Sequence, residues 1–220
     1  MNLELIVEAA GKTIIAVVGT GFGLMLLRRW RQTHERVVLY WAVLFLSSLG
    51  YLVGVLILLG WGDPVLLTRL HYLMALLAAV LGSLAATILM LPLPAGKAER
   101  ISELLPGALF LVLATLALIS PLRLAITGKE YAYVGLVDHI NVAVMILAGL
   151  FSAGTLVFLA WRLKESGYFF MAVAYLLITA GGRMVRSDTL SLALSQVVVL
   201  AGYVLFYWLF SRLMRLEPSA

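Results

Sequence analysis

Seven long apolar runs fill most of this 220-residue chain, and short polar stretches separate them. A run of about 20 mainly apolar residues is long enough to cross a bilayer as an α-helix. Hydrophobic residues make up 63% of the chain and charged residues 12%, whereas an average soluble domain is roughly 45–50% apolar and about 25% charged. The sequence therefore excludes a soluble fold and predicts a multi-pass protein of the cell membrane.

The apolar runs predict an all-α fold rather than a membrane β-barrel. Barrel strands alternate apolar and polar side chains over about ten residues, and the stretch from Val53 to Leu59 is apolar without alternation. Every connection between the runs is short, so we expect one domain over residues 1–220. Its seven transmembrane helices are expected near residues 5–27, 37–60, 65–91, 103–120, 132–161, 167–186 and 190–211.

The positions of Lys and Arg predict the orientation, because short cytoplasmic loops carry an excess of basic side chains. Ten of the sixteen basic residues follow the first, third, fifth and seventh expected helices: Arg28, Arg29, Arg31, Arg36, Lys97, Arg100, Arg162, Lys164, Arg212 and Arg215. The connections on the other side hold Arg123, Lys129 and Arg186. We therefore expect the N-terminus outside and the C-terminus inside, in a cell inner membrane.

The net charge of +5 at pH 7 follows from the same basic residues. Basic patches can attract nucleic acid, but basic residues beside the ends of membrane helices are better placed to contact anionic lipid headgroups. We therefore expect membrane lipid, and no nucleic acid, among the partners of this chain. The chain has no cysteine, which excludes disulfides and thiolate metal sites.

Two glycines of the first expected helix, Gly19 and Gly23, have the G-x-x-x-G spacing. Small residues at this spacing let two membrane helices approach closely. The second helix can belong to the same chain or to a second copy. The spacing is therefore consistent with packing inside the bundle and with a homodimer.

Polar and ionisable side chains within the expected helices gather toward their outer ends. An ionisable side chain in mid-membrane costs about 2.5–3.5 kcal/mol on insertion scales and normally faces the protein interior. Helical spacing puts Asp138 on one face with Asn141, and His71 on the close-packed face of its helix. We therefore expect an outward-facing polar pocket that binds a ligand, lined by Arg69, His71, Tyr72, Asp138, His139, Asn141, Thr179 and Arg183.

Simpler interpretations of these residues are also open. Arg69 and Arg183 lie near helix ends, where a long side chain can reach the headgroups. Asp138 can form a salt bridge with either arginine that only stabilises the fold. Glu8 and Lys12 have the i,i+4 spacing of an ion pair that neutralises both charges near the headgroups.

The two histidines of the expected pocket suggest one metal chemistry. His71 and His139 lie at similar depths, and two imidazoles across a bundle can ligate haem iron while Arg69 and Arg183 hold its propionates. A zinc hydrolase would need a third ligand, and the sequence has no H-x-x-x-H or H-E-x-x-H motif. A b-type haem membrane subunit is thus an alternative; otherwise we expect no cofactor and no catalytic residue.

Several short motifs follow one another in the first 90 residues. Arg28-Arg29 ends the first expected helix, Tyr40-Trp41 begins the second, Gly50-Tyr51 lies midway, and Asp63 precedes an Arg69-x-x-Tyr72 pattern. Over this part the chain resembles the seven-helix membrane sensor region at the N-terminus of some bacterial histidine kinases and cyclic-dinucleotide enzymes. The resemblance implies a bundle that detects a small or lipophilic signal and passes a helix movement to a cytoplasmic domain.

No kinase or cyclase follows the last expected helix in this sequence, so the chain is either a fragment of a longer protein or passes its signal to a partner protein on the cytoplasmic side, and we expect the partner. The sequence thus favours a receptor-like membrane sensor or ligand-binding module. Its polar groups lie on one side of the membrane, whereas a carrier would need a polar path through the other half as well. A substrate-binding subunit of a transporter is a further alternative.

Overall fold

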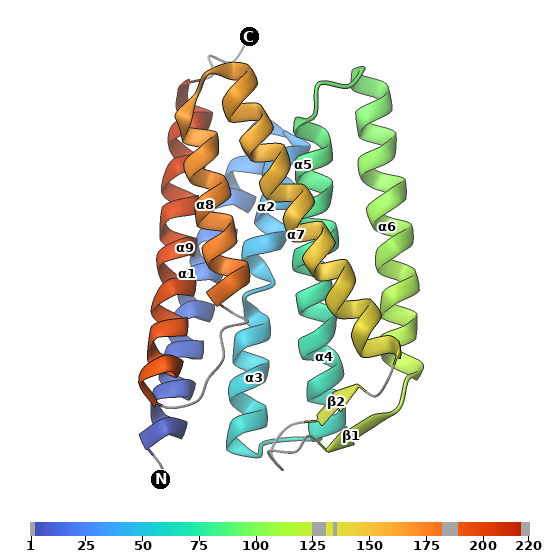
Figure 1. Cartoon of the computed structure of the whole chain (residues 1–220), viewed down its shortest axis with the longest axis vertical. Helices are drawn as coiled ribbons and strands as arrows, with labels where there is room; N and C mark the ends of the chain where they lie inside the picture. The colour runs from blue at the N-terminus through green and yellow to red at the C-terminus, as the bar shows by residue number, and fades with distance from the viewer. Residues whose placement is uncertain (1–2, 125–130, 134–135, 182–188, 217–220) are drawn as a thin grey trace.

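The computed structural model describes residues 3–124, 131–133, 136–181 and 189–216. Within these ranges, side chains are described except at residues 95, 124, 131–133, 136–138, 141, 180–181 and 214–216. In this part of the chain, seven helices run alternately in opposite directions, so the first begins and the last ends at opposite ends of the bundle (Figure 1). The all-α prediction is therefore confirmed.

Five of the seven helices are single elements: α1 (Leu3–Thr33), α6 (Ala95–Ile119), α7 (Leu136–Leu163), α8 (Ser166–Gly181) and α9 (Thr189–Leu216). The second helix consists of α2 (Arg36–Leu46) and α3 (Leu49–Leu59). The third consists of α4 (Pro64–Leu76), a π-helix η1 (Leu77–Leu84) and α5 (Ala85–Met90). Between α6 and α7, the strand β1 (Leu122–Leu124) pairs antiparallel with β2 (Tyr131–Tyr133).

The two ends of the bundle differ in charge. We call the end where α1 ends and α2 begins the basic end, because Arg28, Arg29, Arg31 and Arg36 lie there. We call the end where α3 ends and α4 begins the far end. The basic end lies at the top of Figure 1 and the far end at the bottom.

Six of the described helices are long and apolar enough to cross a membrane, so the chain is a multi-pass helical membrane protein. The exception is α8, whose apolar stretch Ser166–Thr179 is shorter and which ends well short of the far end (Figure 1). Residues 182–186 of the helix expected over 167–186 lie outside the described residues. The orientation across the membrane stays a prediction.

Two expected helix starts are wrong. The helix α6 begins at Ala95 rather than near residue 103, because Glu99 and Glu103 in its early turns pair with Arg36 at the start of α2. Residues 132 and 133 belong to β2 and not to the following helix, because they pair with β1. Pro121 lies between the end of α6 and the start of β1. Aromatic residues such as those of β2 favour strands.

The second helix is interrupted at Ser47 and Ser48, where the sequence predicts a continuous helix. The Ser48 amide donates to the Phe45 carbonyl at 3.1 Å, and the Gly50 amide donates to the Ser47 carbonyl at 2.9 Å. Both bonds reach only three residues back. The Ser47 hydroxyl donates to the Leu44 carbonyl at 2.6 Å. Serine hydroxyls that bond to nearby carbonyls in this way compete with the helical ladder and bend helices.

The third helix widens into η1 midway along its length, next to this interruption. Gly82 of η1 packs on the end of α2, and an added Cβ there would lie 2.9 Å from the Leu44 backbone. Ser83 donates to the Ala79 carbonyl at 2.6 Å, and Thr87 donates to the Ser83 carbonyl at 2.8 Å. Segments of π-helix are rare and often occur at functional sites.

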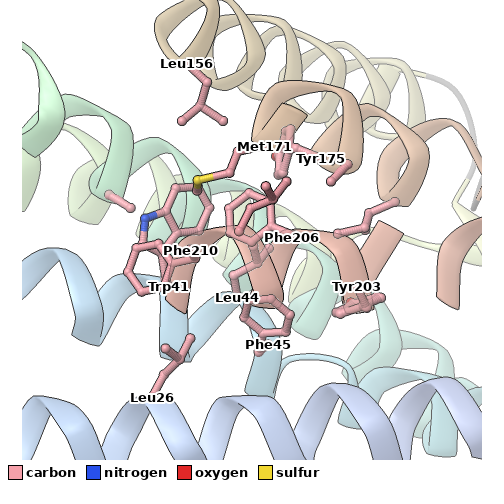
Figure 2. Close-up of a cluster of buried hydrophobic side chains, with 14 of the residues drawn as sticks. Leu26, Trp41, Leu44, Phe45, Leu156, Met171, Tyr175, Tyr203, Phe206 and Phe210 are labelled. Carbon is pink, nitrogen blue, oxygen red and sulfur yellow. The ribbon is translucent and has the colours of Figure 1, made fainter. Parts of the chain in front are cut away.

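Aromatic side chains form the core on the basic side of these irregular stretches (Figure 2). Trp41 and Phe45 of α2 and Phe206 of α9 are fully buried, and the ring centroids of Trp41 and Phe206 lie 4.7 Å apart. The thioether of Met171 from α8 lies beside these rings in Figure 2. Large aromatic contacts of this kind contribute strongly to packing, so they fix α2 firmly against α8 and α9.

The glycine pair of α1 is used inside the chain. An added Cβ at Gly19 would lie 2.4 Å from Ser48 Oγ, and one at Gly23 would lie 2.7 Å from Leu46 Cγ. Both glycines are buried. The G-x-x-x-G face therefore packs α1 on the interrupted helix, and a homodimer would have to use another surface.

Candidate functional site

His71 of α4 faces α3, as its position on the close-packed face of α4 predicts. Its Nδ1 atom lies 2.8 Å from the backbone carbonyl oxygen of Gly50. Because a carbonyl oxygen only accepts, Nδ1 carries the proton of this hydrogen bond. Gly50 also lets the helices approach, since an added Cβ there would lie 2.9 Å from Met74 Cβ. The bond ties α4 to the first turn of α3, directly beyond the interruption at Ser47 and Ser48.

Arg69, two residues earlier on α4, points to a different neighbour. Its Nη2 atom donates to the Ser120 carbonyl at the end of α6, at 3.2 Å. Its Nε atom is buried and has no hydrogen-bond partner within the described part of the chain. Residues two apart on a helix point about 200° apart. Arg69 therefore contacts α6 while His71 contacts α3, and no described contact brings the two side chains together.

The other expected pocket residues are placed only in part. Thr179 bonds to two carbonyls of its own helix, both at 3.1 Å. His139 is exposed on α7, and Tyr72 is partly buried on α4. The side chains of Asp138 and Asn141, and the whole of Arg183, lie outside the described residues. The pocket that all eight residues would share thus stays a prediction.

The haem alternative needs two imidazoles, and the structure describes both. His71 gives its Nδ1 proton to a backbone carbonyl, which is typical of metal-ligating histidines and makes Nε2 the atom that would face a metal. His139 lies exposed on α7. Among the described residues, no group of three or more His, Asp or Glu side chains is close enough to hold a metal ion. The axial pair stays a prediction.

An ion pair between a buried lysine and a partly buried glutamate lies where α1 and α3 meet, in the half of the bundle nearer the far end. The Nζ atom of Lys12 is 2.8 Å from Oε1 of Glu8, and Lys12 is only 7% exposed. Gly54 of α3 lies against the lysine, since an added Cβ there would meet Nζ at the ordinary contact distance of 3.4 Å. The i,i+4 spacing predicts the pair, but it does not predict the contact of Lys12 with α3.

Gln196 of α9 completes this site. Its side chain occupies the space beside Gly11, where an added Cβ would lie 1.4 Å from Oε1, and its Nε2 atom donates to the Glu8 backbone carbonyl at 3.3 Å. We call Glu8, Gly11, Lys12, Gly54 and Gln196 the Lys12 junction. Ionisable side chains inside a membrane bundle are costly and mark functional sites by default. Sequence reasoning missed the junction as a site, because its two glycines lie on different helices.

Hydroxyl groups bridge further helices in the middle of the bundle. Tyr175 of α8 donates to Ser83 Oγ at 2.9 Å, and the hydroxyl oxygens of Thr87 and Ser152 are 3.4 Å apart. All four side chains are buried. They link α8 and α7 to η1 and α5 by hydrogen bonds that carry no formal charge. This part of the bundle therefore offers polar contacts between helices but no charged pair.

No known protein family and no curated protein matches this chain. The resemblance to the sensor regions of histidine kinases is therefore not confirmed. The fold itself defines the class, which is a multi-helix membrane protein with six candidate spans among the described residues.

Proposed function

We propose that this chain is a receptor-like membrane sensor. In this proposal a small or lipophilic ligand is detected by polar groups in the half of the bundle nearer the far end. The response is a change of shape at the basic end, which faces the cytoplasm because basic residues favour that side, and which acts on a partner protein there. The observation that carries the proposal is the Lys12 junction, in which a buried lysine pairs with the partly buried Glu8 and lies against α3.

The Lys12 junction has the chemistry of a site that responds to charge or to hydrogen-bonding groups. Burying two charges is costly, and their attraction compensates only when the geometry is good. A ligand or proton that alters the pair of Glu8 and Lys12 would therefore change the contact between α1 and α3. Gln196 adds amide groups to the same place, and these can bond to a polar ligand.

The helix α3 is well placed to carry such a change. It contacts Lys12 through Gly54 and His71 through Gly50, and both contacts lie on the far side of the interruption at Ser47 and Ser48. On the other side, α2 is fixed by the aromatic core. Hinges form where a few residues at the ends of elements absorb a change of backbone angle. In this proposal α3 changes its angle at the interruption, and the resulting pull on α2 shifts α2, α8 and α9 together at the basic end.

The test removes both charges of the junction while keeping similar shapes. In the Glu8→Gln/Lys12→Met double variant, called the neutral-pair variant, no buried charge is left alone. Hydrogen–deuterium exchange is measured in lipid nanodiscs. We expect changed exchange at the basic end, over residues 34–46 and 98–105, as well as near the junction.

The matched control is Thr13→Val, which alters the next residue of α1. Thr13 is exposed and bonds only within α1, to the Ala9 carbonyl at 2.7 Å, among the contacts described. This variant should leave exchange at the basic end as in the unaltered protein. If the neutral-pair variant changes exchange only around the junction, the sensor proposal is wrong.

A substrate-binding transporter subunit is a second candidate, favoured by the interrupted second helix and the π segment beside it. Transporters often form their sites from discontinuous membrane helices. Co-purification from the native membrane with a transport ATPase separates the two functions. The sensor proposal predicts no such ATPase among the retained proteins, whereas an ATPase retained in a fixed ratio to the chain would favour the transporter subunit.

A further inference from the structure

Two cavities adjoin at the basic end of the bundle. The larger, about 470 Å³, lies between residues 34–37 of the α1–α2 corner and a wall that includes Leu89, Ala98 and Glu99. The smaller, about 240 Å³, is lined mainly by apolar side chains of α5, α7, α8 and α9, including Leu163. Both are lined by Glu35 and Val37, so they meet at the start of α2.

The lining of the larger cavity includes two carboxylates, Glu35 and Glu99, and one guanidinium, Arg36. Glu35 is exposed, and its carboxylate has no ion pair within the described part of the chain. Arg36 contacts Glu103 and Glu99, the latter at 3.8 Å, and both contacts use its Nη1 atom. A guanidinium has five N–H donors, so Arg36 can donate to a further acceptor through its other nitrogens.

The start of α2 adds to the positive side of this cavity. Glu35 occupies the position before the helix, but its side chain makes no capping hydrogen bond to the first turn. The first backbone N–H groups of a helix and its dipole favour an anion. A phosphate beside Arg36 would therefore meet donors from the side chain and from the helix start, while Glu35 would face a cation.

We propose that the two cavities form one binding site for a phospholipid whose headgroup carries both a phosphate and a primary ammonium group. The phosphate lies at Arg36 and the start of α2, and the ammonium group donates to Glu35. One acyl chain packs along the apolar lining of the smaller cavity. Such a lipid satisfies both signs of charge at once, and the proposal is independent of the sensor function.

The charges of the cavity distinguish this headgroup from the alternatives. A choline headgroup has the same phosphate but no N–H donor for Glu35. A glycerol headgroup brings a phosphate without a cation, so Glu35 would face net negative charge. Trp30 lies one turn from the cavity corner, and its ring stands edge-on to His34 at a centroid distance of 6.3 Å. Tryptophan is enriched at the depth of lipid headgroups.

Native mass spectrometry of the purified chain tests the proposal with dioleoyl phosphatidylethanolamine, phosphatidylcholine and phosphatidylglycerol as probes. We expect one phosphatidylethanolamine molecule to be retained at about a tenfold lower concentration than the other two, because neither of them can form a hydrogen-bonded ion pair between an ammonium group and Glu35. Glu35→Gln should abolish this preference. Glu165→Gln, at another corner of the basic end, should keep it, since an amide oxygen can still accept from the Gly167 amide.

A second variant tests the acyl chain separately. Leu163→Trp fills the smaller cavity at a residue that is 55% exposed, so the fold should tolerate it, and it should weaken retention of all three lipids. The proposal is overturned if phosphatidylglycerol is retained best, because basic residues alone then attract lipid. It is also overturned if Glu35→Gln leaves the preference for phosphatidylethanolamine unchanged.

Discussion

The imidazole of His71 bridges two helices, because its Nδ1 atom donates to the Gly50 carbonyl at 2.8 Å. Gly50 lies two residues beyond Ser48, so the bond holds the first turn of α3 directly after the interruption. The bond therefore limits how α3 can move relative to α2.

Removing the imidazole should destabilise the bundle modestly. We expect His71→Leu to lower the free energy of unfolding by about 0.5–1.5 kcal/mol, the usual net value of one hydrogen bond. His139→Leu is the matched control, since His139 is exposed on α7, and it should change stability by less than about 0.5 kcal/mol. Equal losses in the two variants, measured by unfolding in mixed detergent micelles, would show that the His71 bond adds nothing.

Gly82 should tolerate no side chain. An added Cβ would lie 2.9 Å from backbone atoms of Leu44, which cannot move aside as a flexible side chain can. We expect Gly82→Ala to cost about 1–3 kcal/mol by overpacking. Gly154→Ala on α7 is the control, because nothing lies within 4 Å of its added Cβ; alanine there should be neutral or stabilising by up to about 1 kcal/mol. The same cost for both would contradict the close approach of η1 to α2.

The hydroxyls of Ser83 and Tyr175 should be energetically coupled. Ser83→Ala and Tyr175→Phe remove the same 2.9 Å hydrogen bond, so the double variant should lose less stability than the two single losses together, by about 0.5–3 kcal/mol. A double-mutant cycle measures this difference. The pair Tyr175→Phe and Thr115→Val is the control: Thr115 is exposed on α6 and bonds to its own helix, so these losses should add.

Hydropathy predicts the seven helices well and their internal irregularities poorly. The runs of the second and third helices are apolar throughout, and Ser47, Ser48 and Ser83 change their mean hydropathy little. A serine hydroxyl interrupts a helix only where its hydrogen bond to a carbonyl competes with the ladder, and that depends on the neighbouring helix. The interruption and the π segment therefore follow from tertiary packing.

In the candidate site, too, the sequence predicts the local contact and not the contacts between helices. The i,i+4 spacing predicts that Lys12 pairs with Glu8, and the structure confirms it. Nothing in the local sequence indicates that Gly54 would accommodate the lysine or that Gln196 would occupy the space beside Gly11. A similar expected depth placed Arg69 and His71 in one pocket, although residues two apart on a helix face different neighbours.

The central claim is that the Lys12 junction is coupled to the basic end through the interruption of the second helix. The chain has no cysteine, so spin labels can be attached to Gln32→Cys and Arg100→Cys without removing a natural thiol. Both residues are exposed at the basic end, on α1 and α6. Double electron–electron resonance, a pulsed electron paramagnetic resonance method, then gives the distribution of distances between the two labels in nanodiscs.

We expect the neutral-pair variant to shift or broaden this distribution, and Thr13→Val to leave it unchanged. Adding Ser47→Ala and Ser48→Ala to the neutral-pair variant should reduce the shift, because the serine hydroxyls no longer compete with the helical hydrogen bonds at this point. A distribution that is identical in the unaltered protein and in the neutral-pair variant would contradict the coupling.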